Sequence, residues 1–132
     1  MSEAGKPVPE PSSTTAASPI SQPPALVTLD DFKKVSLRVG MILSAEDHPN
    51  ADRLLVLKVD IGEAAPRQVV AGIKGSYQAA DLIGKRVVVV TNLKPALLRG
   101  VESQGMVLAA SDGSSIVVVT PDRPVPAGST VK

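Results

Sequence analysis

Apolar and polar residues alternate along several short stretches of the chain, which predicts strands that bury one face. From residue 35 to residue 43 every second side chain is apolar, and Ser36, Arg38 and Gly40 stand between the first of them. A period of two is the signature of a half-buried strand. We expect Gly40 to mark a bend or a bulge, because glycine weakens a regular strand interior.

Further apolar stretches, bounded by glycine, proline and other turn residues, predict the remaining strands. They cover residues 54–60, 68–73, 85–92, 104–110 and 116–120. Asp112-Gly113 predicts a hairpin turn of the favoured two-residue type before the last of them. The proline-rich end, residues 121–132, cannot extend a central strand, so we expect it along a sheet edge or in an interface.

Two short helices are predicted from capping signals. Thr28 is followed three residues later by Asp31, a capping-box pattern that indicates one helical turn before the first strand. We expect Phe32, which follows it, to plug the core beside that strand. A second helix is expected over residues 76–83, with Ser76 as N-cap and Gly84 as its stop.

Five or six short strands with one helix between the third and the fourth follow the order of a small Greek-key barrel of the oligonucleotide-binding (OB) type. We therefore predict an all-β fold, a five-stranded OB barrel, over residues 27–132. Residues 1–26 are rich in proline, serine and alanine and have few large apolar side chains, so we expect a disordered tail or linker.

Composition excludes several classes of function, but the net charge indicates none. From Thr28 onward there are 13 basic and 11 acidic side chains, too even a balance for a purely electrostatic grip on nucleic acid. There is no cysteine, which excludes disulfides and thiol chemistry and makes the cytoplasm the expected compartment. The longest apolar runs are far shorter than the roughly 20 residues of a membrane-spanning helix, so we expect no membrane partner.

The chain offers little for catalysis. His48 is the one histidine, and it stands in a turn before proline. The first interpretation is a solvated histidine that helps to fix the turn, and the alternative is a ligand contact. General-base or nucleophilic chemistry usually needs several converging His, Cys or carboxylate groups. We expect no enzyme activity, no metal site and no cofactor.

The stretch from residue 92 to residue 110 is the candidate binding loop, polar and basic between two apolar strands. Lys94 and Arg99 flank the stiff Pro95, while Asn92, Ser103 and Gln104 supply neutral donors and acceptors. This mixture suits phosphate and ribose contacts. The alternative is that Asn92 and Ser103 satisfy backbone groups at strand ends and that the charged side chains form a solvated rim. Met106 is a ligand contact or a core filler.

Aromatic residues are scarce, which disfavours recognition of single strands by base stacking. Only Phe32 and Tyr77 are aromatic, whereas single-strand binders on this fold stack several bases. A nucleic-acid ligand would then be a structured RNA, recognised through its shape, phosphates and 2′-hydroxyls.

Several separated blocks of this sequence resemble one known family. They are Asp31 to Gly40, His48-Pro49-Asn50-Ala51-Asp52-Arg53-Leu54, Val70-Ala71-Gly72-Ile73, and Asn92-Leu93-Lys94-Pro95 with Gly105-Met106. The family is the tRNA-binding OB domain of bacterial methionyl-tRNA synthetases, of free-standing dimeric tRNA-binding proteins and of eukaryotic synthetase cofactors. The resemblance covers residues 28–132.

The resemblance implies a non-catalytic tRNA-binding module that forms a homodimer and assists an aminoacyl-tRNA synthetase, methionyl by the family's pattern. The implied contact residues are Arg38, Asn92, Lys94, Arg99, Ser103 and Met106, with Lys33, Lys74 and His48 at the margin. The alternative within the same fold family is a dimeric chaperone-like module that binds unfolded chains. The signature stretches of a synthetase catalytic domain are missing from this sequence.

Two positions depart from the family's pattern. Ser36 stands where members usually have an acidic residue, and Leu97 stands where they have Lys or Arg. Loss of one cation removes about one phosphate contact, so we expect weaker binding with a smaller salt dependence.

Overall fold

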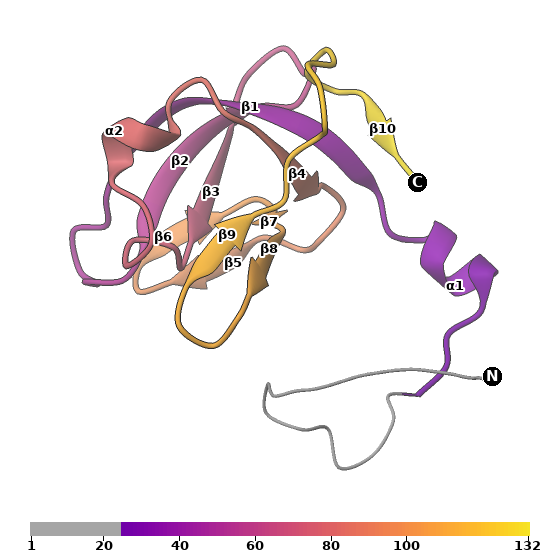
Figure 1. The fold of residues 1–132 in the computed structure, drawn as a ribbon, viewed down its shortest axis with the longest axis horizontal. Helices are drawn as coiled ribbons and strands as arrows, with labels where there is room; N and C mark the ends of the chain where they lie inside the picture. Colours follow the sequence, from indigo (N-terminus) through magenta and orange to yellow (C-terminus); the bar gives the residue numbers. More distant parts are fainter. Residues whose placement is uncertain (1–24) are drawn as a thin grey trace, which may run out of the picture.

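A computed structural model describes residues 25–132 (Figure 1). The tail predicted over residues 1–26 therefore lies, except for its last two residues, outside the described part of the chain. The helices are α1 (Leu29–Lys33) and α2 (Ala79–Leu82). The longer strands are β1 (Leu37–Asp47), β2 (Leu55–Asp60), β3 (Arg67–Ala71) and β4 (Arg86–Val90). The shorter ones are β5 (Ala96–Leu98), β6 (Val101–Ser103), β7 (Met106–Val107), β8 (Ala109–Ser111), β9 (Ile116–Val118) and β10 (Thr130–Val131).

The strands form an OB-like barrel that is nearly closed, which confirms the predicted fold. The main sheet has the order β3-β2-β1-β4-β7, and β3 and β7 at its two ends lie close together. The long β1 crosses the whole barrel and pairs with both β2 and β4 (Figure 1). As predicted, the helix α2 follows the third strand, and its Leu82 is fully buried in the core.

A bulge bends β1, but not at the predicted position. The register with β2 shifts between Ile42 and Ser44, whereas Gly40 keeps a regular pairing with Val87. Gly40 is needed for packing instead, because a Cβ there would lie 2.5 Å from Cγ1 of Val59. The sequence reveals a glycine in a strand but not which of these two causes requires it.

Side chains complete the seam where β3 meets β6 and β7. The backbone N–H of Gln104 donates to the carbonyl of Gln68 at 2.7 Å, and the side-chain Oε1 of Gln104 accepts from the Gln68 N–H at 3.0 Å. Ser103 Oγ accepts from the Val70 N–H and donates to the Gly105 carbonyl, both at 2.9 Å. Ser103 is only 4% exposed, so its hydroxyl serves the barrel.

The Ser103→Ala variant should lose about 1–3 kcal/mol of unfolding free energy, because the buried Val70 N–H is left without an acceptor. Urea denaturation followed by circular dichroism measures this loss. An unchanged midpoint would show that the seam does not need the hydroxyl.

Two local predictions near the helices are wrong. α2 begins at Ala79 with Gln78 as N-cap, because Ser76 Oγ accepts instead from the Ile116 N–H of β9 at 2.8 Å. Phe32 is 44% exposed and no residue of α1 is buried, because α1 stands beside the barrel and not over its core. The cap of α1 is as predicted, with the Asp31 N–H donating to Thr28 Oγ1 at 3.0 Å.

The hairpin predicted around residues 112–113 exists as β8 and β9, but its turn is longer than two residues. Ser111 pairs with Ile116, so residues 112–115 form the loop. The Asp112 carboxylate accepts from the backbone N–H groups of Ser114 and Ser115, at 2.9 and 2.7 Å. These bonds lower the pKa of Asp112 from 3.8 to about 2.

Because the pKa of Asp112 is lowered in the folded chain, the carboxylate stabilises the loop at pH values above about 3.8, and this stabilisation disappears as the pH falls through about 2. We expect the NMR resonance of the Asp112 side-chain carboxyl carbon to titrate with a midpoint near 2. A midpoint near 4 would contradict the hydrogen-bonded loop.

The proline-rich end reaches a sheet edge, one of the two predicted locations. Strand β10 pairs with β1, with Val131 opposite Leu37 and Thr130 opposite Arg38. No helix in the described part of the chain is long and apolar enough to cross a membrane.

Candidate functional site

The predicted binding loop contains a β-hairpin that the sequence pattern did not indicate. β5 and β6 pair antiparallel, and Arg99 and Gly100 form the turn between Leu98 and Val101. Both turn residues have positive φ, 54° for Arg99 and 90° for Gly100, as a two-residue turn of type I′ requires. An arginine in this region of φ is strained, so surrounding contacts must hold it there.

Those contacts come from the loop between β1 and β2, here called the 48–53 loop. His48 Nε2 donates to the Leu98 carbonyl at 2.8 Å, while His48 Nδ1 accepts from the Asn50 N–H at 2.9 Å. Arg99 Nη2 donates to the Asn50 carbonyl at 3.2 Å, and Asn50 Nδ2 donates to the Arg99 carbonyl at 3.5 Å. The hairpin tip and the 48–53 loop thus form one rigid unit.

His48 is therefore not a solvated histidine, because it is only 5% exposed. Its bonds to Leu98 and Asn50 specify the neutral form with the proton on Nε2. The sequence also suggested that His48 fixes its own turn, and the hydrogen bond from the Asn50 N–H agrees with this role. Through its bond to the Leu98 carbonyl, the buried ring also holds the hairpin against the 48–53 loop.

Lys94 and Arg99 place two cations on the outside of this unit. Lys94 lies just before β5 and Arg99 at the hairpin tip, and both side chains are exposed. Within residues 25–132 no acidic side chain forms an ion pair with either. Both charges are available to an anionic ligand.

Asn92, at the end of β4, uses its side chain to join α1 to the barrel. Its Oδ1 accepts from the Ser36 N–H at 2.8 Å, and its Nδ2 donates to the Lys34 carbonyl at 2.5 Å. For Asn92, as for Ser103, the structure matches the interpretation in which the side chain satisfies the backbone. Their roles as RNA contacts stay predictions.

The remaining predicted contact residues are spread over the surface. Arg38 is half-buried on β1. The hydrogen bond from Arg67 lowers the pKa of Glu63, and the charge of Arg38 adds a smaller effect in the same direction. Lys74 pairs with Asp47 at 3.3 Å. Lys33 lies on α1, away from the hairpin (Figure 1). The structure does not bring these three to the hairpin tip.

Two apolar residues of the predicted binding loop are exposed. Met106 is 46% exposed on β7, so it is not a core filler, and it lines a hollow with residues 70–73 at the end of β3. Leu97, which stands in place of the expected cation, is 74% exposed opposite Glu102 in the hairpin. Of the two, Leu97 lies on the hairpin that carries Arg99.

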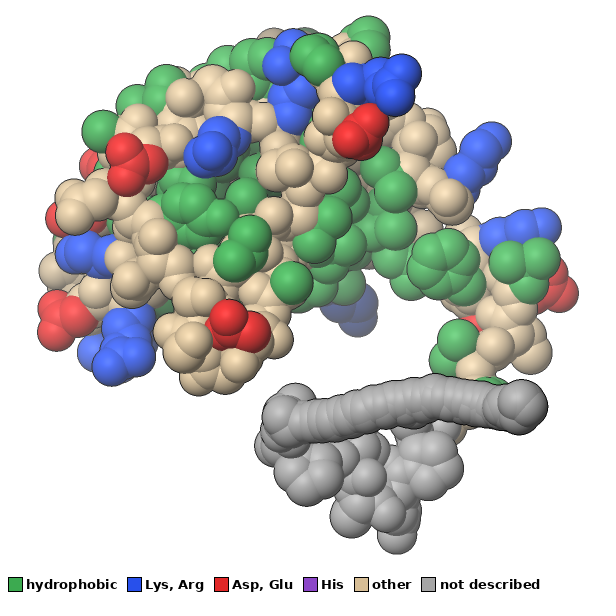
Figure 2. Space-filling model, in the orientation of Figure 1, with side chains coloured by type: hydrophobic (Ala, Val, Ile, Leu, Met, Phe, Trp, Pro, Cys, Tyr) green, Lys and Arg blue, Asp and Glu red, His purple; other side chains and the backbone are tan. Residues whose placement is uncertain are grey.

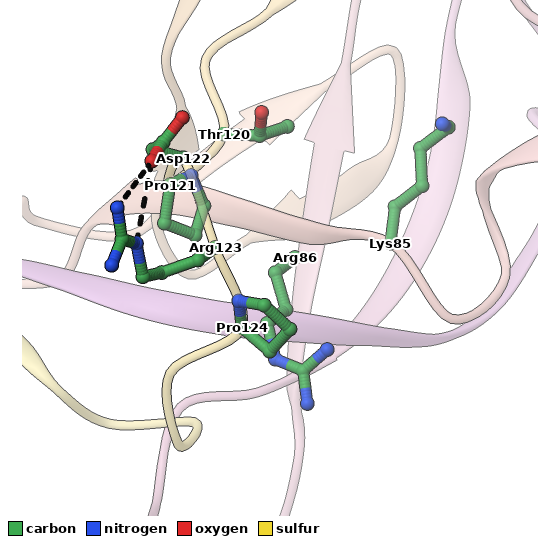
Figure 3. A pocket seen from close by; sticks show the side chains of 7 residues that line it. All are labelled: Lys85, Arg86, Thr120, Pro121, Asp122, Arg123 and Pro124. Atoms are coloured by element: carbon green, nitrogen blue, oxygen red, sulfur yellow. Dashed lines mark hydrogen bonds and ion pairs between the residues drawn. The ribbon is translucent and has the colours of Figure 1, made fainter.

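A second group of cations, Lys85, Arg86 and Arg123, lines a hollow of about 210 Å³ near the start of β4 (Figure 3). The three side chains point in different directions, and Arg123 pairs with Asp122 at 3.2 Å. Arg86 Nε donates a hydrogen bond to the Val125 carbonyl at 2.9 Å. This hollow is therefore not a preformed anion site. No group of three or more potential metal ligands occurs among the described residues.

Known proteins resemble this chain in both sequence and fold. Residues 37–130 match the family described as "Putative tRNA binding domain". A methionine–tRNA ligase of Thermococcus kodakarensis is 51% identical over 106 residues, which are 80% of this chain and 14% of that protein. The chain thus spans about one-seventh of such a relative's length.

Two solved structures share the fold over most of the described residues. A MetRS-related protein from Pyrococcus horikoshii has a TM-score of 0.75 and 34% identity, covering 82% of this chain and 99% of that one. The chaperone CsaA from Bacillus anthracis has a TM-score of 0.74 and 30% identity, covering 82% and 100%.

Proposed function

This chain belongs to the tRNA-binding domain family, and on that premise we propose that it is a non-catalytic module that binds structured tRNA through the hairpin tip and the 48–53 loop. The proposal includes assistance to an aminoacyl-tRNA synthetase, methionyl by its relatives, in the cytoplasm. The contact set that we favour is Lys94, Arg99 and Met106, with Asn92, Ser103 and His48 holding the surface in place. Arg38, Lys33 and Lys74 are secondary contacts for an RNA large enough to reach them.

The observation that carries this proposal is the rigid joining of the two loops. A strained Arg99 is held by Asn50, and the buried His48 locks Leu98 to the same loop. Presetting a cation in this way lowers the ordering cost of binding. Exposed cations on a fixed scaffold suit phosphates whose spacing is itself fixed, as in a folded RNA.

A mobility-shift titration with unfractionated tRNA tests the proposal directly. Binding should be tight at about 50 mM salt and weaken as salt is added. A plot of log Kd against log salt concentration should be a rising straight line. Absence of a shift at about 50 mM salt would reject tRNA binding, because phosphate contacts are strongest there.

The proposed assistance to a synthetase acts through the effective concentration of tRNA near the catalytic body. A weak tRNA site tethered to a catalytic body raises the local concentration of tRNA at that body. Fusing this chain to a methionyl-tRNA synthetase catalytic body should lower KM for tRNA and leave kcat unchanged. Equal KM values with and without the module would contradict this role.

The second candidate function is binding of unfolded protein chains, which the likeness to the chaperone CsaA and the exposed Leu93, Leu97 and Met106 favour. This function predicts suppression of aggregation that does not depend on Lys94 or Arg99. Light scattering of a heated client protein, with and without the K94A/R99A variant, separates it from tRNA binding.

The homodimer forms, in this proposal, through the apolar side of α1. Leu29, Phe32 and Val35 are exposed beside Leu37 and Val131, and with their neighbours they line a hollow of about 310 Å³. Figure 2 shows hydrophobic side chains gathered between the barrel and α1. A second copy related by a two-fold axis would cover the same patch on both chains.

We expect Phe32→Ser to convert the dimer to a monomer at micromolar concentration, because the variant removes the largest apolar side chain of this patch. Multi-angle light scattering measures the mass. The control is Leu97→Ser, which is more exposed but lies on the hairpin. A wild-type monomer would reject the dimer.

A further inference from the structure

Arg53 separates two hollows that lie side by side on the barrel. The first, of about 450 Å³, lies between residues 50–54 and Arg99 of the hairpin. The second, of about 390 Å³, is lined by Arg53, by Gly72, Gly75 and Ser76, and by the loop between β8 and β9. The Arg53 side chain is exposed and forms no ion pair with any described residue. A ligand that leaves the hairpin tip along the first hollow meets this guanidinium next.

The edge of the second hollow holds two glycines that the fold itself does not require. Gly72 and Gly75 both have φ outside the left-handed region. A Cβ on Gly75 would meet nothing within 4 Å, and one on Gly72 would meet only Leu54 Cδ2 at 3.7 Å, an ordinary contact. Gly75 lies in a turn and Gly72 in a bend, but neither a left-handed φ nor packing requires a glycine there. The backbone at both positions is therefore open to close approach of a ligand.

Two hydroxyl groups in the same hollow accept a hydrogen bond but do not donate one to the described part of the chain. Ser76 Oγ accepts from the Ile116 N–H at 2.8 Å, and Ser111 Oγ accepts from the Gly113 N–H at 3.3 Å. Neither hydroxyl has a hydrogen-bond acceptor among the described residues, so both can donate to a bound ligand. Ser114 and Ser115 differ, because their hydroxyls donate to Asp112.

Two acidic side chains lie near the second hollow, but neither lines it. Asp112 turns its carboxylate into its own loop, where the N–H groups of Ser114 and Ser115 offset its charge. Asp52 lines the first hollow, on the side that carries Arg53 and Arg99. The second hollow therefore combines one cation, two hydroxyl donors and open glycine backbone, which is the chemistry that receives a sugar-phosphate backbone.

We propose that this second hollow is a backbone-binding subsite that continues the RNA surface from the hairpin tip, with Arg53 on a phosphate and Ser76 and Ser111 on neighbouring phosphate or ribose oxygens. The subsite rests on the proposed tRNA binding and extends it past the 48–53 loop. Gly72 and Gly75 let the RNA backbone approach the surface. The RNA then runs from β5 and β6 toward the loop between β8 and β9.

Two variants of the full chain test the subsite by mobility shift with unfractionated tRNA. Arg53→Gln should weaken binding at least threefold and reduce the slope of log Kd against log salt by about one. Gly75→Leu should weaken it at least threefold by filling the subsite, while the melting temperature stays within a few degrees because a Cβ at this position meets no atom within 4 Å. The control is Arg123→Gln, which removes the same charge from a distant, exposed position.

The outcomes separate this inference from the proposed function. If wild type binds tRNA and both variants fall below Arg123→Gln, the subsite is supported. If wild type binds and either variant binds as tightly as Arg123→Gln, the subsite is rejected while tRNA binding stands. If wild type does not bind, the proposed function fails and the subsite fails with it.

Discussion

Replacing Lys94 and Arg99 together with alanine should weaken tRNA binding at least several-fold and leave the barrel folded. Both side chains are exposed and neither forms an ion pair within the described chain; the variant loses the exposed bond from Arg99 to the Asn50 carbonyl but no buried contact of the barrel. Loss of two phosphate contacts should also reduce the slope of log Kd against log salt by roughly 1.5. Mobility-shift titrations at several salt concentrations measure both effects.

The matched control for this variant is Lys85→Ala with Arg123→Ala. It removes the same charge from exposed positions around a hollow where the cations diverge. We expect the control to bind tRNA nearly as wild type does. Equal weakening in both double variants would mean that total charge, and not the hairpin, determines binding, and unchanged affinity of K94A/R99A with native circular dichroism would refute the site.

A large loss of stability is expected for Gly40→Ala. The alanine Cβ would lie 2.5 Å from Val59 Cγ1 and 3.2 Å from both Ile61 Cγ2 and Val89 Cγ2, all in the packed core. Overpacking of this kind costs about 1–3 kcal/mol, or a melting temperature lower by roughly 4–8 °C per kcal/mol in a domain of this size.

Gly75→Ala is the matched control for Gly40→Ala, since its Cβ would meet nothing within 4 Å. It should be neutral or slightly stabilising, because alanine restricts the unfolded chain. Urea denaturation of the two variants gives the comparison. Equal midpoints would show that Val59 and its neighbours move aside and that Gly40 is not a packing requirement.

The barrel could be predicted because its signals are local. Alternation in β1, a short helix after β3 and turn residues between strands are read from neighbouring positions. The hairpin of β5 and β6 could not be predicted in the same way, since Leu97 and Leu98 are both exposed and show no alternation. Its position depends on the bond from His48 to Leu98, fifty residues apart in the chain.

The candidate site was predicted in part for similar reasons. The exposed cations Lys94 and Arg99 lie where the polar stretch placed them. For Asn92 and Ser103 the residue type fits both a ligand contact and a backbone acceptor, and only the structure shows that Ser36 and Val70 use them. Arg53 gives no local signal, because the other residues that line the second hollow lie about 20 to 60 residues further along the chain.

The most direct test of the hairpin surface is an NMR titration of the isotope-labelled chain with tRNA, which maps contacts residue by residue. We expect the largest amide shift changes or line broadening at Asn50, Lys94, Arg99 and Gly100, where the 48–53 loop meets the hairpin. Changes confined to α1 and β10, with the hairpin unaffected, would contradict tRNA binding at the hairpin.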